Sequence, residues 1–359
     1  VDDYLRGFGV TGRRTLSDDG GKANLFATLG PAAPGGVVLS GHTDVVPVEG
    51  QPWTSEPFTL SRRGARLFGR GTADMKSFLA VALALVPEAL EAGLKRPIHL
   101  ALSYDEEIGC FGVGRMIDDV VRNLPMPAAV VIGEPTDMRL VSAHKGGYGF
   151  ETEVTGKEAH SSQPHLGASA ILAAAELIGF LAETAEDLRR SAPADCPFEP
   201  PHSTISVGTV AGGAALNIIA RRCVFGWDLR TIPGDRAEEV LERFNRYAEE
   251  EVLPRLRATA PEAAIVTRTT SWVPALAPED DGPAEALIRL LTGANRTHVV
   301  SYCTEGGLFQ EAGLSTVVCG PGSIDQAHRP DEFIEIAQIE ACEAFVRKLI
   351  AWAAGDGPA

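Results

Sequence analysis

The chain has 359 residues, and its 48 acidic and 32 basic side chains give a formal net charge of −16. This acidity excludes nucleic acids and anionic membranes as expected partners, because both would repel the chain. The length exceeds what one ordinary domain usually holds, so two domains are expected. No apolar run approaches the roughly 20 residues that span a bilayer.

Six cysteines are spread along the chain, and no two of them are spaced as CxxC. We therefore expect mostly buried free thiols in a reducing compartment, the cytoplasm. The first residue is Val1, with no initiator Met, in a segment that resembles the middle of a helix. We expect that some native N-terminal residues are missing. The cysteines are Cys110, Cys196, Cys223, Cys303, Cys319 and Cys342.

The first part of the chain alternates short apolar runs with segments of helical spacing. Strands are expected over Val37–Ser40, Ile98–Leu102 and Ala128–Ile132, and helices over Met75–Leu90 and Ile108–Val121. This alternation predicts a mainly parallel sheet covered by helices on both faces.

From about residue 147 the order of the elements changes to strand-helix-strand-strand-helix-strand. This order is the split βαβ pattern of a small ferredoxin-like domain. The expected strands are Gly149–Val154, His202–Val210, Cys223–Leu229 and Ala263–Thr269, and the expected helices are Ala168–Ala182 and Arg236–Leu256.

The α/β character returns near Asp280 and ends in a helix expected over Ala337–Trp352. We therefore predict one mainly parallel α/β domain made of residues 1–146 and 272–359. A ferredoxin-like α+β domain, residues 147–271, is inserted into it.

Three expected strands of the α/β domain run directly into side chains that can bind a metal ion. In open α/β sheets, ligands bind at the carboxyl edge of the strands. One strand that ends in an acid is unremarkable, but three in one domain suggest a site. These side chains are His42 and Asp44 after the first strand, Asp105, Glu106 and Glu107 after the second, and Glu134 after the third.

Each of these clusters also has a plainer explanation. A lone His-x-Asp such as His42 and Asp44 is usually a surface turn, although on an extended chain both side chains point to one face. Asp74, after two glycines, would be a helix cap if it stood alone. Three successive carboxylates at 105–107 would be a solvated helix start, but their mutual repulsion favours a bound cation.

His328 follows another strand-like run and a Gly/Pro turn, so the inventory holds two histidines and several carboxylates. No thiolate ligand is convincing. Nitrogen and oxygen donors of this kind suit zinc, cobalt or manganese.

Five short strings occur in one order over nearly the whole chain from about Asn24 onward. Together they resemble the M20 metallopeptidase family, and their number and order make this resemblance specific. They are SGHTDVVP (40–47), GRGTADMK (69–76), DEE (105–107), GEPT (133–136) and AHRPDE (327–332). Three more strings are similar to those of family members that act on N-acetylornithine: AHKGG (143–147), CTEGGLFQ (303–310) and CGPGSIDQAH (319–328).

The resemblance implies a hydrolase that uses two divalent metal ions, zinc or cobalt, to cleave the amide of an N-acyl amino acid. N-acetylornithine, cleaved to ornithine and acetate in arginine biosynthesis, is the favoured substrate. Asp74 would bridge the two metals. His42 and Glu134 would complete one site, and Glu107 and His328 the other.

The resemblance also implies that Glu106 is the general base, that Asp44 orients His42, and that the peptide after Asp74 is cis. Glu305 is a separate hypothesis that does not come from the family, because its carboxylate could meet the ammonium group of ornithine.

The inserted domain would act as a lid and as the surface of a homodimer. His160, by itself only a polar loop residue, would donate to the oxyanion. Arg230 would bind the substrate carboxylate, and Asn217 would contact the substrate. Ala220 stands where the family often has proline, which leaves the role of Asn217 open.

Other functions remain open at this point. A succinyl-diaminopimelate desuccinylase, an aminoacylase or a dipeptidase would use the same metal site. An inactive metal-binding scaffold is a different class, against which the complete ligand set argues. A serine hydrolase is disfavoured because no GxSxG string is present.

Overall fold

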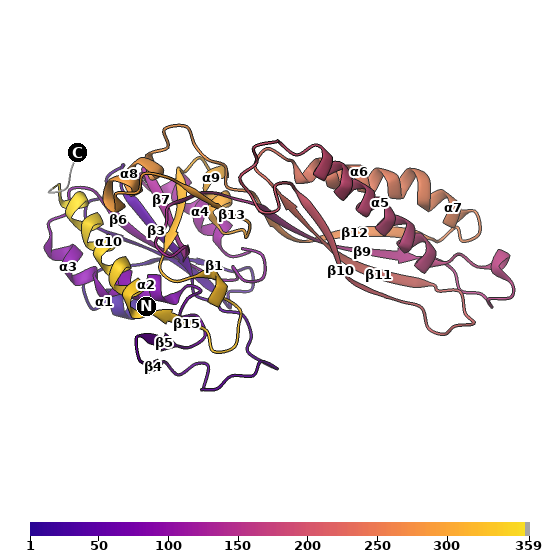
Figure 1. Ribbon diagram of the computed structural model, residues 1–359, viewed down its shortest axis with the longest axis horizontal. Helices are drawn as coiled ribbons and strands as arrows, with labels where there is room; N and C mark the ends of the chain where they lie inside the picture. The colour runs from indigo at the N-terminus through magenta and orange to yellow at the C-terminus, as the bar shows by residue number, and fades with distance from the viewer. Residues whose placement is uncertain (356–359) are drawn as a thin grey trace. The chain divides into compact units, whose positions relative to one another are not determined.

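A computed structural model describes residues Val1–Gly355 and divides the chain into two compact units (Figure 1). The first, here called the α/β unit, consists of Val1–His144 and the chain from Leu276 onward. The second, here called the inserted unit, is Lys145–Ala275. Among the described residues, no helix is both long enough and apolar enough to cross a membrane.

The α/β unit is built on an eight-stranded sheet with the order β1-β2-β6-β3-β7-β14-β8-β13. Its four central strands β6, β3, β7 and β14 run parallel to one another, so the predicted mainly parallel sheet is confirmed. The strands are β1 (Arg13–Leu16), β2 (Ala23–Leu29), β3 (Val37–His42), β6 (Ile98–Ser103), β7 (Ala129–Pro135), β8 (Val141–His144), β13 (His298–Val300) and β14 (Thr316–Gly320).

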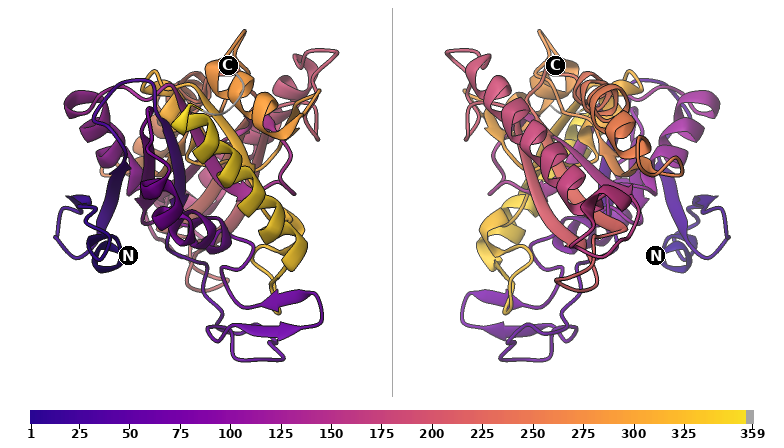
Figure 2. Two further views of the ribbon diagram at one scale, coloured as in Figure 1. Left: turned by 90° about the vertical axis from the view of Figure 1, so that its left-hand side faces the viewer. Right: turned by 90° about the vertical axis from the view of Figure 1, so that its right-hand side faces the viewer.

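All residues of β3, β6 and β7 are buried, as expected for strands covered on both faces. On one face, α2 (Lys76–Ala84), α8 (Pro283–Thr292) and α10 (Ile336–Ala354) pack with the sheet in one apolar core. The long C-terminal helix α10 contacts α2 (Figure 2). Two other helices, α4 (Val113–Asn123) and α9 (Gly306–Glu311), contact β2 and β14.

Short elements complete the α/β unit. Helix α1 (Asp2–Arg6) lies at the N-terminus, and α3 (Val86–Glu91) follows α2. A small second sheet pairs β15 (Phe333–Glu335) with the hairpin of β4 (Ser61–Arg63) and β5 (Arg66–Phe68).

Two predicted helices differ in extent from the observed ones. The helix expected over 75–90 is divided at Leu85, because Pro87 has no N–H to donate to the carbonyl of Leu83. The helix expected from Ile108 begins only at Val113, because Gly109 and Cys110 have φ values of 122° and 57° that a right-handed helix excludes.

The inserted unit contains a four-stranded antiparallel sheet with the order β10-β11-β9-β12. Along the chain its elements alternate as predicted for a split βαβ domain. They are β9 (Gly146–Thr155), α5 (Ala170–Arg190), β10 (Thr204–Gly212), β11 (Arg222–Thr231), α6 (Ala237–Tyr247) and β12 (Ala264–Val273).

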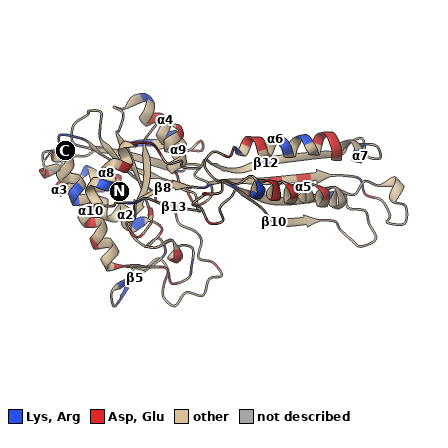
Figure 3. Ribbon diagram, turned by 45° about the horizontal axis from the view of Figure 1, so that its top comes forward, with Lys and Arg blue, Asp and Glu red and all other residues tan. Residues whose placement is uncertain are grey.

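Helices α5 and α6 pack on one face of this sheet. Alternate residues of β11 are buried, and Trp227 stacks on Phe150 with ring centroids 4.1 Å apart. The exposed sides of the helices carry charges of both signs (Figure 3), including Arg243 on α6, whose Nη2 lies 2.6 Å from Asp187 Oδ2 on α5.

Helix α6 continues through a π-helical turn, Ala248–Val252, into α7 (Leu253–Arg257). The predicted single helix over 236–256 is therefore present but irregular. Pro254 causes the irregularity, because it has no N–H to donate to the carbonyl of Glu250.

His99 on β6 makes the stability of the α/β unit depend on pH. It is 3% exposed, stacks on Phe26, and has Nδ1 3.0 Å from Thr28 Oγ1. Burial lowers the pKa of His99 to about 4 from an ordinary value of 6.5. Between these values the unfolded chain binds a proton that the folded chain does not. The contribution of His99 to the unfolding free energy is thus complete above pH 6.5 and is lost as the pH falls towards about 4, by up to about 3 kcal/mol.

We expect His99→Gln to flatten this part of the pH dependence. Urea unfolding at about pH 7 and about pH 5 measures it through the difference in unfolding free energy. His165→Gln, at an exposed position, is the matched control and should leave the difference unchanged. An equal pH dependence in His99→Gln and the unmodified chain would contradict the assignment.

Candidate metal centre

Four neighbouring parallel strands bring predicted ligands to one edge of the sheet. His42 is the last residue of β3, and Glu134 is the last but one of β7. Glu107 follows β6, and His328 follows β14. Because the strands are parallel, their carboxyl ends lie at the same edge, where open α/β sheets bind ligands.

Asp74 reaches this edge from the loop that precedes α2. Gly71 in this loop has a φ of 85°, which glycine adopts without strain. The peptide between Asp74 and Met75 is cis, as expected. Gly133, next to Glu134, lets α2 approach β7, because a Cβ atom there would lie 2.1 Å from Phe78.

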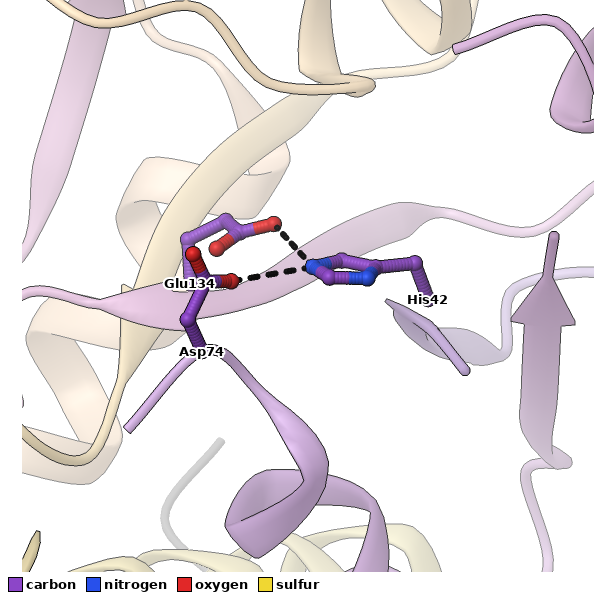
Figure 4. A group of neighbouring side chains, drawn as sticks. All are labelled: His42, Asp74 and Glu134. Carbon is purple, nitrogen blue, oxygen red and sulfur yellow. Dashed lines mark hydrogen bonds and ion pairs between the residues drawn. The ribbon is translucent and has the colours of Figure 1, made fainter. Parts of the chain in front are cut away.

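The ligand atoms form two groups that share Asp74. In the first group, His42 Nε2 lies 3.0 Å from Asp74 Oδ1 and 3.5 Å from Glu134 Oε1 (Figure 4). In the second, His328 Nε2 lies 3.2 Å from Asp74 Oδ2 and 3.0 Å from Glu107 Oε2. Within each group the ligand atoms are all within 4.8 Å of one another. Each oxygen of Asp74 therefore faces a different group.

This donor set fits two divalent cations. The carboxylates of Asp74, Glu107 and Glu134 have side chains less than 10% exposed, and like charges in such a place are costly without cations. Burial and the charge of Asp74 raise the pKa of Glu134 well above its usual value. Hydrogen bonds to Asp74 and Glu107 raise the pKa of His328 to about 10. Protons thus supply part of the positive charge that cations would bring.

Asp44 fixes the ring of His42, chiefly through its backbone. The Asp44 carbonyl lies 3.0 Å from His42 Nδ1, and its carboxylate Oδ1 lies 3.5 Å away. A carbonyl only accepts, so a neutral ring carries its proton on Nδ1 and directs the Nε2 lone pair towards Asp74 and Glu134. The Asp44 carboxylate also accepts a hydrogen bond from the N–H of Glu107 at 3.1 Å.

Glu106, next to the candidate ligand Glu107, is suited to hold and release a proton. Burial raises the pKa of Glu106 to about 8, with His42 opposing the shift and Glu305 adding to it. The thiol of Cys110 donates to Glu106 Oε1 at a sulfur–oxygen distance of 3.5 Å. Burial raises the pKa of this thiol, which keeps it a donor. No sequence pattern predicts a role for Cys110, which stands in no recognisable string.

Glu305 lies inside the α/β unit and is 1% exposed. Burial, opposed by the hydroxyl of Ser103, raises its pKa to about 7. Because the carboxylate is enclosed, the predicted contact with a substrate ammonium group would need the surrounding side chains to move.

The remaining predicted residues belong to the inserted unit. His160 is exposed, and its Nδ1 accepts a hydrogen bond from the N–H of Ser162 at 3.2 Å, so a neutral ring carries its proton on Nε2. The adjacent Ser161 donates its N–H to the carbonyl of Asn217 at 3.0 Å, which brings these two loops together. Arg230 on β11 donates through Nε to Asp228 at 3.0 Å.

A mainly parallel sheet with two acid-and-histidine groups at its carboxyl edge is suited to metal-dependent hydrolysis. Residues 38–352 match peptidase family M20/M25/M40, and the chain belongs to this family. It is therefore a metal-dependent amidohydrolase, as the resemblance of the five strings implied.

Two relatives within reach of sequence comparison are acetylornithine deacetylases. An acetylornithine deacetylase of Photorhabdus laumondii is 34% identical over 333 residues, which cover 92% of this chain and 83% of the relative. An acetylornithine deacetylase of Proteus mirabilis is 35% identical over 330 residues, with coverage of 92% and 82%.

Solved structures share the fold. The M20 metallo-carboxypeptidase Sso-CP2 of Sulfolobus solfataricus has a TM-score of 0.75 at 18% identity, covering 98% of this chain and 92% of that one. The YXEP protein of Bacillus subtilis, described as a dinuclear metal-binding M20 peptidase, has a TM-score of 0.62 at 16% identity, with coverage of 99% and 90%.

Proposed function

We propose that this amidohydrolase removes the acyl group from an N-acyl amino acid, with N-acetylornithine as the favoured substrate in arginine biosynthesis. The pair of ligand groups that share Asp74 carries the proposal for the chemistry. The two acetylornithine deacetylases at 34% and 35% identity support the substrate. Six free cysteines support the cytoplasm, a reducing compartment, as the location of the enzyme.

In this proposal, His42, Asp74 and Glu134 would hold one divalent cation, and Asp74, Glu107 and His328 would hold the other. Zinc or cobalt suits these nitrogen and oxygen donors. When bound, such a pair supplies an acidified water and a polarised substrate carbonyl.

The chain's own residues move the protons and orient the substrate. Glu106 takes a proton from the attacking water and passes it to the leaving amine nitrogen. His160 donates from Nε2 to the oxyanion that forms on the amide carbonyl. Arg230 binds the substrate carboxylate, for which its planar fork is suited, and Asn217 makes a further substrate contact.

Sister specificities share this chemistry and differ only in the substrate. A succinyl-diaminopimelate desuccinylase, an aminoacylase or a dipeptidase would use the same ligand groups.

Metal removal tests the proposal. A chelator should abolish amine release from N-acetylornithine, and added Zn²⁺ or Co²⁺ should restore it, because the acidified water is lost with the cations. The same assay is then repeated with N-succinyl-diaminopimelate, N-acyl neutral amino acids and dipeptides, and the substrates are ranked by their kcat/KM. A higher kcat/KM for another member of this panel would overturn the substrate, and chelator-resistant turnover would overturn the metal chemistry.

We also propose a homodimer formed through the inserted unit. Apolar side chains are exposed there, including Leu172 at 71%, Val210 at 58% and Leu216 at 103%, which is typical of a surface that meets a partner. Light scattering should give twice the chain mass, and Leu216→Asp together with Leu172→Asp should halve it. A monomeric unmodified chain would contradict the proposal.

A further inference from the structure

Glu332 lies outside the two ligand groups but contacts the backbone that carries Asp74. It is 1% exposed and follows His328 by four residues. Its Oε1 accepts hydrogen bonds from the N–H groups of Ala73 at 2.7 Å and Asp74 at 3.1 Å. Its Oε2 accepts from the N–H of Gly71 at 3.0 Å. One carboxylate thus holds three N–H groups of the loop that carries Asp74.

This loop needs such an acceptor. Residues 69–75 are buried and belong to no helix or strand, so their N–H groups lack the partners that regular structure provides. A charged acceptor makes shorter and stronger hydrogen bonds than a neutral one. Glu332 supplies such an acceptor to three of these N–H groups, including that of Asp74 itself.

Arg70 pairs with Glu332 and extends the contact to the turn that carries His328. Its Nη1 lies 2.8 Å from Glu332 Oε2, and both side chains are at most 1% exposed. The same nitrogen donates to the carbonyl of Arg329 at 3.3 Å. Arg70 Nη2 donates to Gln51 Oε1 at 2.6 Å, and Gln51 Nε2 donates to the carbonyl of His328 at 3.0 Å.

We propose that Glu332, paired with Arg70, is a positioning residue for the metal centre and acts most strongly on the cation held by Asp74, Glu107 and His328. The inference deepens the proposed function and rests on it. The pair fixes the loop of Asp74 and the turn of His328 together. His328 has a φ of 62°, which a non-glycine residue holds only when its surroundings impose it.

Co²⁺ binding tests this role without relying on activity. The metal-free full chain is titrated with Co²⁺ and followed by calorimetry and by visible absorption. Glu332→Gln should weaken the second Co²⁺ by about 10- to 100-fold, the usual effect of losing a partner that orients a ligand. Its titration should resemble that of His328→Ala, which lacks a ligand of the same group. Glu335→Gln, three residues on and in an exposed ion pair with Arg66, should match the unmodified chain.

If Glu332→Gln does not fold, Gln51→Ala tests the inference instead. The Gln51→Ala substitution leaves the buried Arg70–Glu332 ion pair intact. It should retain a Tm near that of the unmodified chain and weaken the second Co²⁺ by about threefold to tenfold, as expected when the hydrogen bond to the carbonyl of His328 is lost. If folded Glu332→Gln binds both Co²⁺ ions as tightly as the unmodified chain does, the inference is overturned and the proposed function is not. If Glu332→Gln is unfolded, the same result in Gln51→Ala has the same meaning. An unmodified chain that binds no Co²⁺ would overturn the proposed function and the inference with it.

Discussion

A Glu106→Gln variant should bind both metal ions as the unmodified chain does and hydrolyse the N-acyl amino acid about a thousandfold more slowly. Gln is nearly the same size and keeps one acceptor oxygen, but it takes up no proton from water. Glu106 lies next to the ligand Glu107, and no described ligand atom depends on its carboxylate for a hydrogen bond. The loss should therefore fall on kcat, with KM nearly unchanged.

Asp105→Asn is the matched control for this experiment. The residue precedes Glu106, and its carboxylate pairs with Lys22 and belongs to neither ligand group. Its φ is 58°, a conformation that Asn tolerates well. We expect near-normal kcat. Steady-state kinetics together with Co²⁺ titration measure both variants. A Glu106→Gln enzyme with normal kcat would show that another group carries the proton.

The convergence of the ligand residues was open to prediction because parallel strands share one edge. His42, Glu107 and Glu134 each end or follow a largely apolar run, which indicates a buried strand. The order β6-β3-β7-β14 was not predictable, since it depends on pairing between segments far apart in the chain. Asp74 precedes a helix, so its reach to this edge was implied only by the family resemblance.

Other features were missed for particular physical reasons. The short strands β8 and β13 have only four and three residues, too few for a periodic pattern. The division of the helix predicted over 75–90 was missed although Pro87 is in the sequence. The helical spacing of apolar residues around Pro87 favoured one continuous helix. Glu332 contacts backbone N–H groups, which carry no side-chain signal, and Arg70, which lies far away in the chain. The burial of Glu305 follows from packing at the start of α9, and charge alone suggested an exposed role.

The candidate metal ligands and the residues proposed to contact the substrate belong to different units. The metal centre lies entirely in the α/β unit, where the ligand groups are supported by strands and by the Arg70–Glu332 pair. His160, Asn217 and Arg230 stand on loops and a strand of the inserted unit. Changes at these three positions should therefore alter KM and kcat without altering metal content, whereas changes at the ligands should alter metal content first.

Asp74→Asn should remove both metal ions together and abolish hydrolysis. Asp74 Oδ1 faces His42 and Oδ2 faces His328, so one substitution reaches both groups. An amide offers one oxygen and no charge, so at least one group loses its ligand and both lose the shared anion. The affinity loss should exceed the about 10- to 100-fold that follows loss of an outer partner, and turnover should fall by about a thousandfold or more.

Metal content by atomic emission separates a shared ligand from an ordinary one. His42→Ala and His328→Ala each remove a ligand of one group, and each should leave about one ion bound, whereas Asp74→Asn should leave none. Asp119→Asn, at a surface acid paired with Arg13, controls for loss of a carboxylate in general and should keep two. If Asp74→Asn retained one ion as the histidine variants do, Asp74 would belong to a single site, and the two-metal arrangement would need a different bridge.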